Sequence, residues 1–339
     1  MSMKRMISAR WRWLAVTAVP MFFSAFMAPA MAIDADLVVG PNECAECHKA
    51  EAAVWQKTHH FATYRSLPQS KEAKEIAGKM GVKRLKADSL CLNCHFTTQT
   101  VNSKPDVIAG ISCESCHSAG KNWYKVHSGF SGKKEGQETP EEIAARWAKA
   151  EEAGMIRPKM TYALAKNCFS CHLVPNEKLV NVGGHAAGSP FELVSWSQGE
   201  VRHNNWYNKG ASNKEASIER KRMLFVVGRI VELETALIGV SKATEKADYA
   251  LKMAKRADNA RKVIASLAKL LPDAPELVEI YKAANSAKLK LNNEAELTEA
   301  AGKVSVLGLQ FSNTYDGTTF AAIDKYIPGP DKFKGPVSN

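Results

Sequence analysis

The last third of the chain carries apolar residues at helical spacing. Between residues 217 and 314 there is no Cys, His or Trp, and apolar residues recur every three or four positions. This period predicts amphipathic helices over about 224–238, 247–271, 275–287 and 294–312. We therefore expect an α-helical hairpin or small bundle over 214–314, with a Pro/Gly-rich extended tail over 315–339. A scaffold role explains this region more simply than a docking or dimerising surface does.

The N-terminal segment, 1–32, follows a different pattern. A basic stretch without acidic residues precedes an apolar run over 13–28, and Ala28-Pro-Ala-Met-Ala32 provides small residues at the cleavage positions. This order is typical of a secretory signal peptide of the Sec route. A membrane anchor is disfavoured because Pro20 interrupts the run, which is shorter than the roughly 20 residues that a spanning helix needs. The mature protein is thus expected to be exported, into the periplasm of a Gram-negative source, without a later membrane span.

The cysteines lie between these two regions, in four copies of one pattern. Each copy reads Cys-x-x-Cys-His, the attachment motif of c-type haem. Two thiols three positions apart reach two vinyl groups of one porphyrin, and the next His supplies a nitrogen to the iron. The expected thioether residues are Cys44, Cys47, Cys91, Cys94, Cys113, Cys116, Cys168 and Cys171, and the expected proximal ligands are His48, His95, His117 and His172. We expect four covalently bound haem groups over 33–213.

Other uses of paired cysteines account for the pattern less well. Disulfides in an exported protein need no His after each pair. Zinc sites use two pairs or a pair with two His. A thioredoxin-like pair follows a strand of a βαβ unit, and no motif here does. Only covalent haem requires all three parts of the motif at once.

Composition and charge narrow the class of protein. The chain is 45% hydrophobic and 24% charged, which excludes a disordered chain and a polytopic membrane protein. The formal net charge is +11, of which the segment 1–32 carries +4. The eight negative charges of the haem propionates would offset the remaining +7, so nucleic acid is not an expected partner. Remaining positive surface can steer an acidic partner.

Five further His are candidates for the distal side of the irons. They are His59, His60, His127, His185 and His203. No His follows position 203, so the range of these five matches that of the haem motifs. Ligation by two His suits electron transfer, because neither oxidation state needs a new ligand. Neighbouring His59 and His60 diverge by about 100° on a helix, so one of the two can face a given iron.

These motifs resemble the tetrahaem cytochrome c-554 family, whose members accept electrons from hydroxylamine oxidoreductase. The resemblance rests on the order of the four motifs, on Trp55-Gln-Lys-Thr-His-His60, and on Cys113-Glu-Ser-Cys-His-Ser-Ala-Gly120 followed by His127. It covers roughly residues 40–207. The resemblance to a W-x-x-S-x-H segment implies that His60, rather than His59, is a ligand.

The family pattern also implies crossed ligation. His127 would cap the haem at His48, His60 the haem at His172, and His203 or His185 the haem at His117. The haem at His95 would then be five-coordinate. Because two late His are available in this chain, that haem could also be capped, and the sequence leaves the choice open.

The expected fold is mainly α, with little strand. Short helices are predicted over 70–80 and from Pro140 to about 153, the second opened by a capping box at Thr139. The short spacing between His95 and His117 favours the second and third haems as the stacked pair.

Three functions are compatible with these features. An electron carrier between periplasmic redox proteins fits four close haems best. A haem enzyme acting on a small nitrogen compound at an open haem, that of Cys91/Cys94/His95, is the alternative. A structural unit in chains of cytochromes is a third, and the oligomeric state is open, with a homo-oligomer possible. No protein side chain stands out as a catalytic acid or base.

Overall fold

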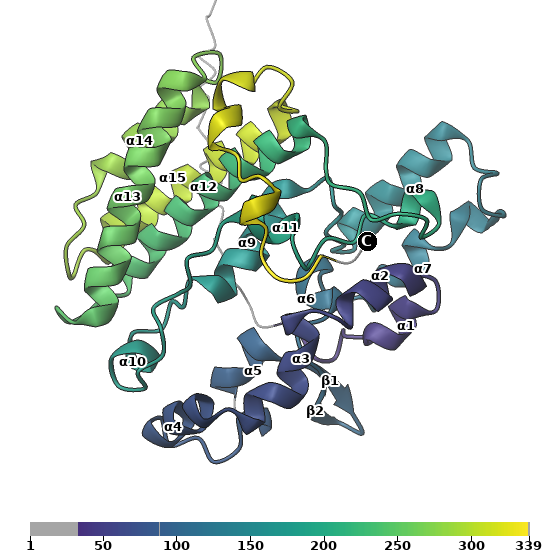
Figure 1. Ribbon diagram of the computed structural model, residues 1–339, viewed down its shortest axis with the longest axis horizontal. Coiled ribbons are helices and arrows are strands. Elements are labelled where there is room, and N and C mark those ends of the chain that lie inside the picture. Colours follow the sequence, from purple (N-terminus) through teal and green to yellow (C-terminus); the bar gives the residue numbers. More distant parts are fainter. Residues whose placement is uncertain (1–32, 88, 338–339) are drawn as a thin grey trace, which may run out of the picture.

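The structure is a computed structural model that describes residues 33–87 and 89–337. The predicted signal peptide, residues 1–32, lies outside the described residues. Helices dominate, which confirms the mainly α fold. In Figure 1 the C-terminal helices form one side of the molecule, and the short helices that carry the Cys-x-x-Cys-His motifs form the other.

Four long helices form the expected C-terminal bundle. They are α12 (Ile218–Ser241), α13 (Asp248–Leu270), α14 (Glu276–Ser286) and α15 (Glu294–Thr314). Helix α12 is central, since α13, α15 and α9 (Thr161–His172) all pack against it. Its apolar residues are buried around most of its circumference, as expected of a helix enclosed by neighbours.

Close packing at Gly308 brings three helices together. A Cβ at this position of α15 would lie 2.6 Å from Ile230 on α12 and 2.6 Å from the ring of Tyr162 on α9. Only Gly allows the backbone of α15 to approach this closely. The fourth haem motif, which ends α9, is therefore held rigidly against the bundle.

The hydrophobic core does not stop at the predicted boundary near residue 213. Tyr162, Ala165, Phe169 and Leu173 belong to the same buried cluster as the bundle. The division into domains over 33–213 and 214–314 stays a prediction, but α9 is shared by both.

The segments around the motifs are short helices. They are α1 (Pro41–Ala45), α2 (Lys49–Trp55), α3 (His59–Ser66), α4 (Lys71–Lys79), α5 (Ser89–His95), α6 (Cys113–His117), α7 (Tyr124–His127), α8 (Pro140–Glu152), α10 (Glu177–Asn181) and α11 (Leu193–Ser197). Short 3₁₀ turns, η1 (Leu67–Gln69), η2 (Leu85–Ala87), η3 (Phe130–Gly132) and η4 (Trp206–Asn208), join some of them. Helices α4 and α8 match the predicted ones, and α8 begins with the predicted capping box of Thr139 and Glu142.

A β-hairpin was not predicted. Strands β1 (Thr97–Val101) and β2 (Lys104–Ala109) pair antiparallel and join the second motif to the third. Asn102 and Ser103 form the turn with φ values of 50° and 60°, which match the right-handed twist of a two-residue hairpin. The signal was the β-branched run of β1 next to an Asn.

The tail is more ordered than the extended segment predicted. It forms η5 (Ala321–Tyr326) and η6 (Pro330–Lys332), and Phe320 and Ile323 are buried. The Lys334 N–H donates to Ser195 O (3.0 Å), and the Glu200 N–H donates to Lys334 O (2.8 Å). The tail thus returns to the haem-motif region, as Figure 1 shows.

Among the described helices, none is both long and apolar enough to cross a membrane.

A buried carboxylate joins α9 to α12, and its removal tests that joint. Glu234 accepts a hydrogen bond from the Tyr162 hydroxyl and one from Lys166 Nζ (2.9 Å). We expect Glu234→Gln to lower the free energy of unfolding by about 1–3 kcal/mol, because it removes a charge-assisted bond in the core. The measurement is chemical denaturation of the holoprotein.

Glu299→Gln is the matched control for that experiment. Glu299 pairs with Lys303 (2.7 Å) on the exposed face of α15. Surface ion pairs contribute little, so this variant should unfold as the wild type does. Equal loss in both variants would show that the Glu234 contacts do not join the helices.

Candidate haem centres

Each Cys-x-x-Cys-His motif lies on a helix or a helical turn. The first spans the end of α1 and the turn before α2, and the other three end α5, α6 and α9. Helical spacing puts the two thiols of a motif on one face, with the His following directly. None of the eight cysteines forms a disulfide. No cluster of three or more potential metal-ligating side chains occurs in the part of the chain that the structure describes.

The central observation is that each motif His faces a second His from a distant segment. The ring centres are 6.2 Å apart for His48 and His127, 6.2 Å for His60 and His172, 6.3 Å for His95 and His185, and 6.2 Å for His117 and His203. The structure thus brings together all four motif His and four of the five further candidates.

This repeated spacing has the value expected for two ligands of one metal. A metal–imidazole bond is about 2.0–2.1 Å long and the ring centre lies roughly 1.1 Å behind the nitrogen, so the ring centres are about 6.2 Å apart. Other ring pairs range from 4.4 Å for His172 and Phe191 to 6.4 Å for His127 and Trp147, so the distinguishing feature is that four nearly equal spacings each pair a motif His with a second His. The four His pairs therefore fit axial ligation of four irons.

His59 is turned away from this arrangement. It opens α3 after the N-cap Thr58, and its Nδ1 lies 2.7 Å from a carboxylate oxygen of Glu200. Its side chain is 77% exposed, whereas Glu200 is buried. Residue 60 follows about 100° further around the helix and points at His172. The orientation agrees with the predicted preference for His60.

Hydrogen bonds set the imidazole tautomers of several of these His. The Nδ1 atoms of His117, His185 and His203 lie 2.7, 2.8 and 2.7 Å from the backbone carbonyls of residues 156, 186 and 201. A carbonyl only accepts, so Nδ1 carries the proton and Nε2 keeps a free lone pair. Metal-ligating His in proteins have this second partner almost always.

Burial keeps most of these imidazoles neutral. It lowers the pKa of His117 and His172 to about 4, with a smaller contribution from neighbouring His. Burial is also the main cause of the lowered pKa of His48, His60, His95 and His127. A neutral imidazole has the lone pair that a metal needs.

The motifs lie in two pairs. Interaction with the Cys113 thiol, together with burial, raises the pKa of Cys44. The Cys171 thiol lies 3.9 Å from the Asn93 carbonyl inside the second motif, and interaction with the Cys94 thiol lowers the pKa of Cys171 to about 7. The first motif is thus next to the third, and the second next to the fourth. Thr97, two residues after His95, also contacts Ser115 of the third motif (3.4 Å), so the expected stacking of the second and third haems stays a prediction.

A buried carboxylate holds the first pair together. Glu114, inside the third motif, accepts hydrogen bonds from the backbone N–H groups of Val39 (2.9 Å), Gly40 (2.8 Å) and Gly120 (2.6 Å). The chain directly before the first motif is therefore fastened to the third motif. Glu114 was not predicted as a functional residue, because nothing in the Cys-x-x-Cys-His pattern distinguishes its two variable positions.

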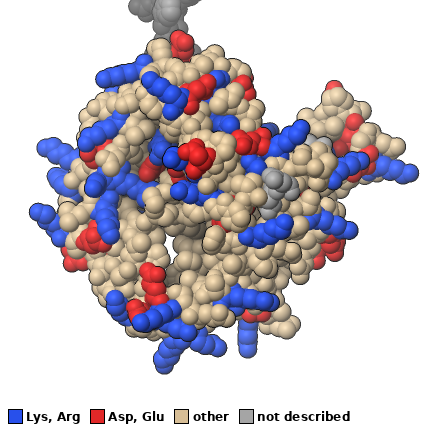
Figure 2. All heavy atoms as spheres, viewed as in Figure 1, with Lys and Arg blue, Asp and Glu red and all other residues tan. Residues whose placement is uncertain are grey.

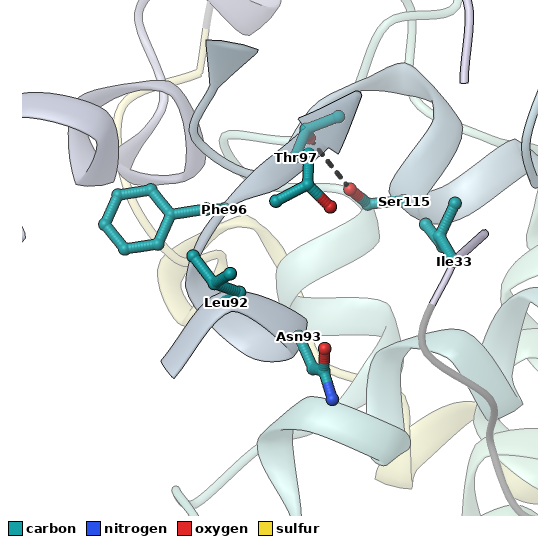
Figure 3. Close-up of a pocket in the computed structure, with 7 residues that line it drawn as sticks. Ile33, Leu92, Asn93, Phe96, Thr97 and Ser115 are labelled. Carbon is teal, nitrogen blue, oxygen red and sulfur yellow. Dashed lines mark hydrogen bonds between the residues drawn. The ribbon is translucent and has the colours of Figure 1, made fainter. Parts of the chain in front are cut away.

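A small cavity lies between the second and third motifs. Figure 3 shows Leu92, Asn93, Thr97 and Ser115 around it, with Thr97 and Ser115 hydrogen-bonded (3.4 Å). Its enclosed volume of about 20 Å³ is enough for one water molecule. It is too small for a porphyrin or a substrate.

Two buried side-chain N–H groups near His127 and His203 provide a further test of whether the surrounding residues fit a haem. Trp123 Nε1, in the turn that leads to His127, and Arg202 Nε, next to His203, are buried without a hydrogen-bond partner in the protein. Buried N–H groups are normally bonded. Porphyrin propionates are acceptors of the kind that these donors need, so the residues around both His fit a haem.

Comparison with known proteins supports this interpretation. The family described as cytochrome c554 and c-prime matches residues 43–118, which hold the first three motifs. Cytochrome c-554 of Nitrosomonas europaea is 31% identical over 144 residues, which are 40% of this chain and 57% of that protein. The chain thus spans little more than half the length of this relative. No solved structure matches the chain.

Neighbouring His59 and His60 provide a matched pair of variants. His60→Ala should turn one haem of the holoprotein high-spin, because its iron loses one axial nitrogen. His59→Ala should leave all spectra unchanged, since this side chain points at Glu200. Electron paramagnetic resonance of the ferric proteins makes the comparison. A high-spin signal in His59→Ala alone would reverse the assignment.

Proposed function

We propose that the protein is a periplasmic tetrahaem cytochrome that passes electrons between redox proteins, which its similarity to the cytochrome c-554 family supports. The observation that carries the proposal is the set of four His pairs with ring centres 6.2–6.3 Å apart. When bound, the haem irons supply reversible one-electron oxidation and reduction. The rest of the proposal concerns what the chain's own residues do.

The residues have three tasks in this proposal. Cys44, Cys47, Cys91, Cys94, Cys113, Cys116, Cys168 and Cys171 attach four porphyrins through thioether bonds. His48, His95, His117 and His172 are the proximal ligands, and His127, His185, His203 and His60, respectively, are their distal ligands. Two imidazoles held in place by the fold would hold each haem iron, whose coordination would then need no change between its two oxidation states, as rapid electron transfer requires.

The position of His185 favours an electron carrier over a haem enzyme. The family pattern implies an open haem at His95, and an open position is what an enzyme acting on a small nitrogen compound would need. Here the His185 ring lies opposite His95, with ring centres 6.3 Å apart, and its Nδ1 is fixed by the Ala186 carbonyl. This arrangement supports four six-coordinate haems and thus the carrier.

The pairing of the motifs supports close electron transfer within the protein. Glu114 of the third motif accepts hydrogen bonds from Val39 and Gly40 just before the first motif, and the Cys171 thiol of the fourth motif lies 3.9 Å from the Asn93 carbonyl of the second. Cys116 and Cys168 influence each other across the two pairs of motifs. Four porphyrins attached at these thiols would form one continuous group.

The number of haems is tested by mass and by spin state. The exported protein should carry an added mass of about four times 616 Da, since each motif attaches one haem. The ferric protein should be entirely low-spin and unchanged by nitric oxide or hydroxylamine. A mass increase of three haems or fewer would contradict the proposal.

Separate replacement of the two late His tests the carrier against the enzyme. His185→Ala and His203→Ala should each turn one haem high-spin and open it to nitric oxide. The two signals should belong to different haems, so the double variant should show twice the high-spin intensity of either single variant. A high-spin, ligand-binding haem in the wild type that His185→Ala leaves unchanged would favour the enzyme.

A further inference from the structure

The positive charge of the haem-motif region is concentrated in one segment. Residues 57–87 contain eight Lys and Arg but only two Glu, a net charge of +6. The remainder of 33–213 has 14 basic and 17 acidic residues. All of the positive excess of this region therefore lies in 57–87, which we call the basic lobe. It consists of α3, η1, α4 and η2.

The basic side chains of the lobe face solvent. Seven of the eight are exposed, namely Lys57, Arg65, Lys71, Lys74, Lys79, Lys83 and Arg84. Among described residues, one of the lobe's Lys and Arg side chains forms an ion pair, Lys71 with Glu75 (3.9 Å). Figure 2 shows Lys and Arg side chains projecting from the lower edge of the molecule, where α4 lies in Figure 1. The lobe presents positive charge outward and does not neutralise it internally.

The lobe borders the second candidate haem centre on both sides. On the side of His95, the Thr63 hydroxyl donates to the His95 carbonyl (3.0 Å), and Lys86 Nζ lies 5.8 Å from the centre of the Phe96 ring. On the side of His185, the Lys79 ammonium lies against Gly184, 3.3 Å from where a Cβ would be. A molecule bound to the lobe would therefore lie at the edge of this centre.

We propose that the basic lobe is the docking surface for an acidic redox protein, which it places at the edge of the centre formed by His95 and His185. This inference rests on the proposed function. Charge complementarity favours a protein partner, because the lysines are spread over an exposed surface instead of converging on one small anion. Complementary charges raise association rates by roughly 10- to 1,000-fold at low salt and orient the partner.

The test uses two sets of charge reversals of equal size. The first is Lys71→Glu, Lys74→Glu and Lys83→Glu in the lobe. The control is Lys255→Glu, Lys269→Glu and Lys288→Glu on the bundle, where the lysines are also exposed and have no ion pair among described residues. Both sets change the net charge by the same amount. A difference in binding between the two variants is therefore caused by where the replaced lysines lie.

The probe is an acidic plant-type ferredoxin. Its binding to each holoprotein is measured by calorimetry, and its oxidation by stopped flow, from low salt to 0.5 M NaCl. We expect wild type and control to bind it at low salt and lose binding as salt rises, because charges are screened within about 10 Å at 0.1 M. The lobe variant should bind at least ten-fold more weakly at low salt.

Several outcomes would overturn the proposal. Equal weakening in both variants would assign the effect to net charge alone. Absence of salt-dependent binding by the wild type would exclude the docking surface. Vesicles of phosphatidylglycerol form a second arm. Loss of vesicle binding in the lobe variant, with ferredoxin binding intact, would assign the lobe to a lipid surface.

Failure of the docking proposal and failure of the proposed function are distinguishable. Haem mass and ferric spin state are recorded first for all three proteins. Four low-spin haems without docking would refute only the lobe, whereas missing haem would refute the carrier itself. Lys71→Gln, Lys74→Gln and Lys83→Gln, which neutralise the same lysines, should give a smaller loss in the same direction.

Discussion

The rest of the structure depends on one constraint: at each candidate iron site, the imidazole of a motif His must face the imidazole of a second His. Each pair joins segments that lie far apart in the chain, as His60 and His172 do. Closing loops of this length costs conformational entropy, and the short helices between them bury few side chains of their own. Metal binding supplies free energy for such folding in other small metal-rich domains. Here the cofactors would take the place of the apolar core that the region around the first three motifs lacks.

The sequence predicted best what one local pattern determines. The four motifs, the helices α4 and α8, and the bundle helices each follow from residues close together in the chain. The choice of His60 over His59 came instead from the resemblance of this segment to W-x-x-S-x-H. What the sequence left open depends on distant contacts. Whether His185 or His203 faces His117 is decided by where α10 and α11 place two loops relative to α5 and α6, and no local pattern encodes that.

The features that were missed depend on distant contacts. The stacking of the second and third haems stays a prediction, but the β-hairpin that joins these two motifs was not predicted. Glu114 then fastens the third motif to the chain before the first. Likewise, the tail was judged from its Pro and Gly content, whereas Phe320 and Ile323 anchor it in the bundle core.

The bundle gains a specific role from its contact with α9. The apolar residues of α12 through α15 can form a core without any cofactor, and that core includes Phe169, between the two cysteines of the fourth motif. Gly308 and Glu234 fix the angle and register of α9 on this core. The fourth motif is therefore the one whose position the polypeptide determines by itself. Because the Cys171 thiol lies 3.9 Å from the Asn93 carbonyl of the second motif, and Asn167 Nδ2 donates to the Cys116 carbonyl of the third (2.8 Å), the second and third motifs are positioned relative to it. The helical bundle thus holds the fourth motif in place, and through it the second and third motifs, which lie on short helices.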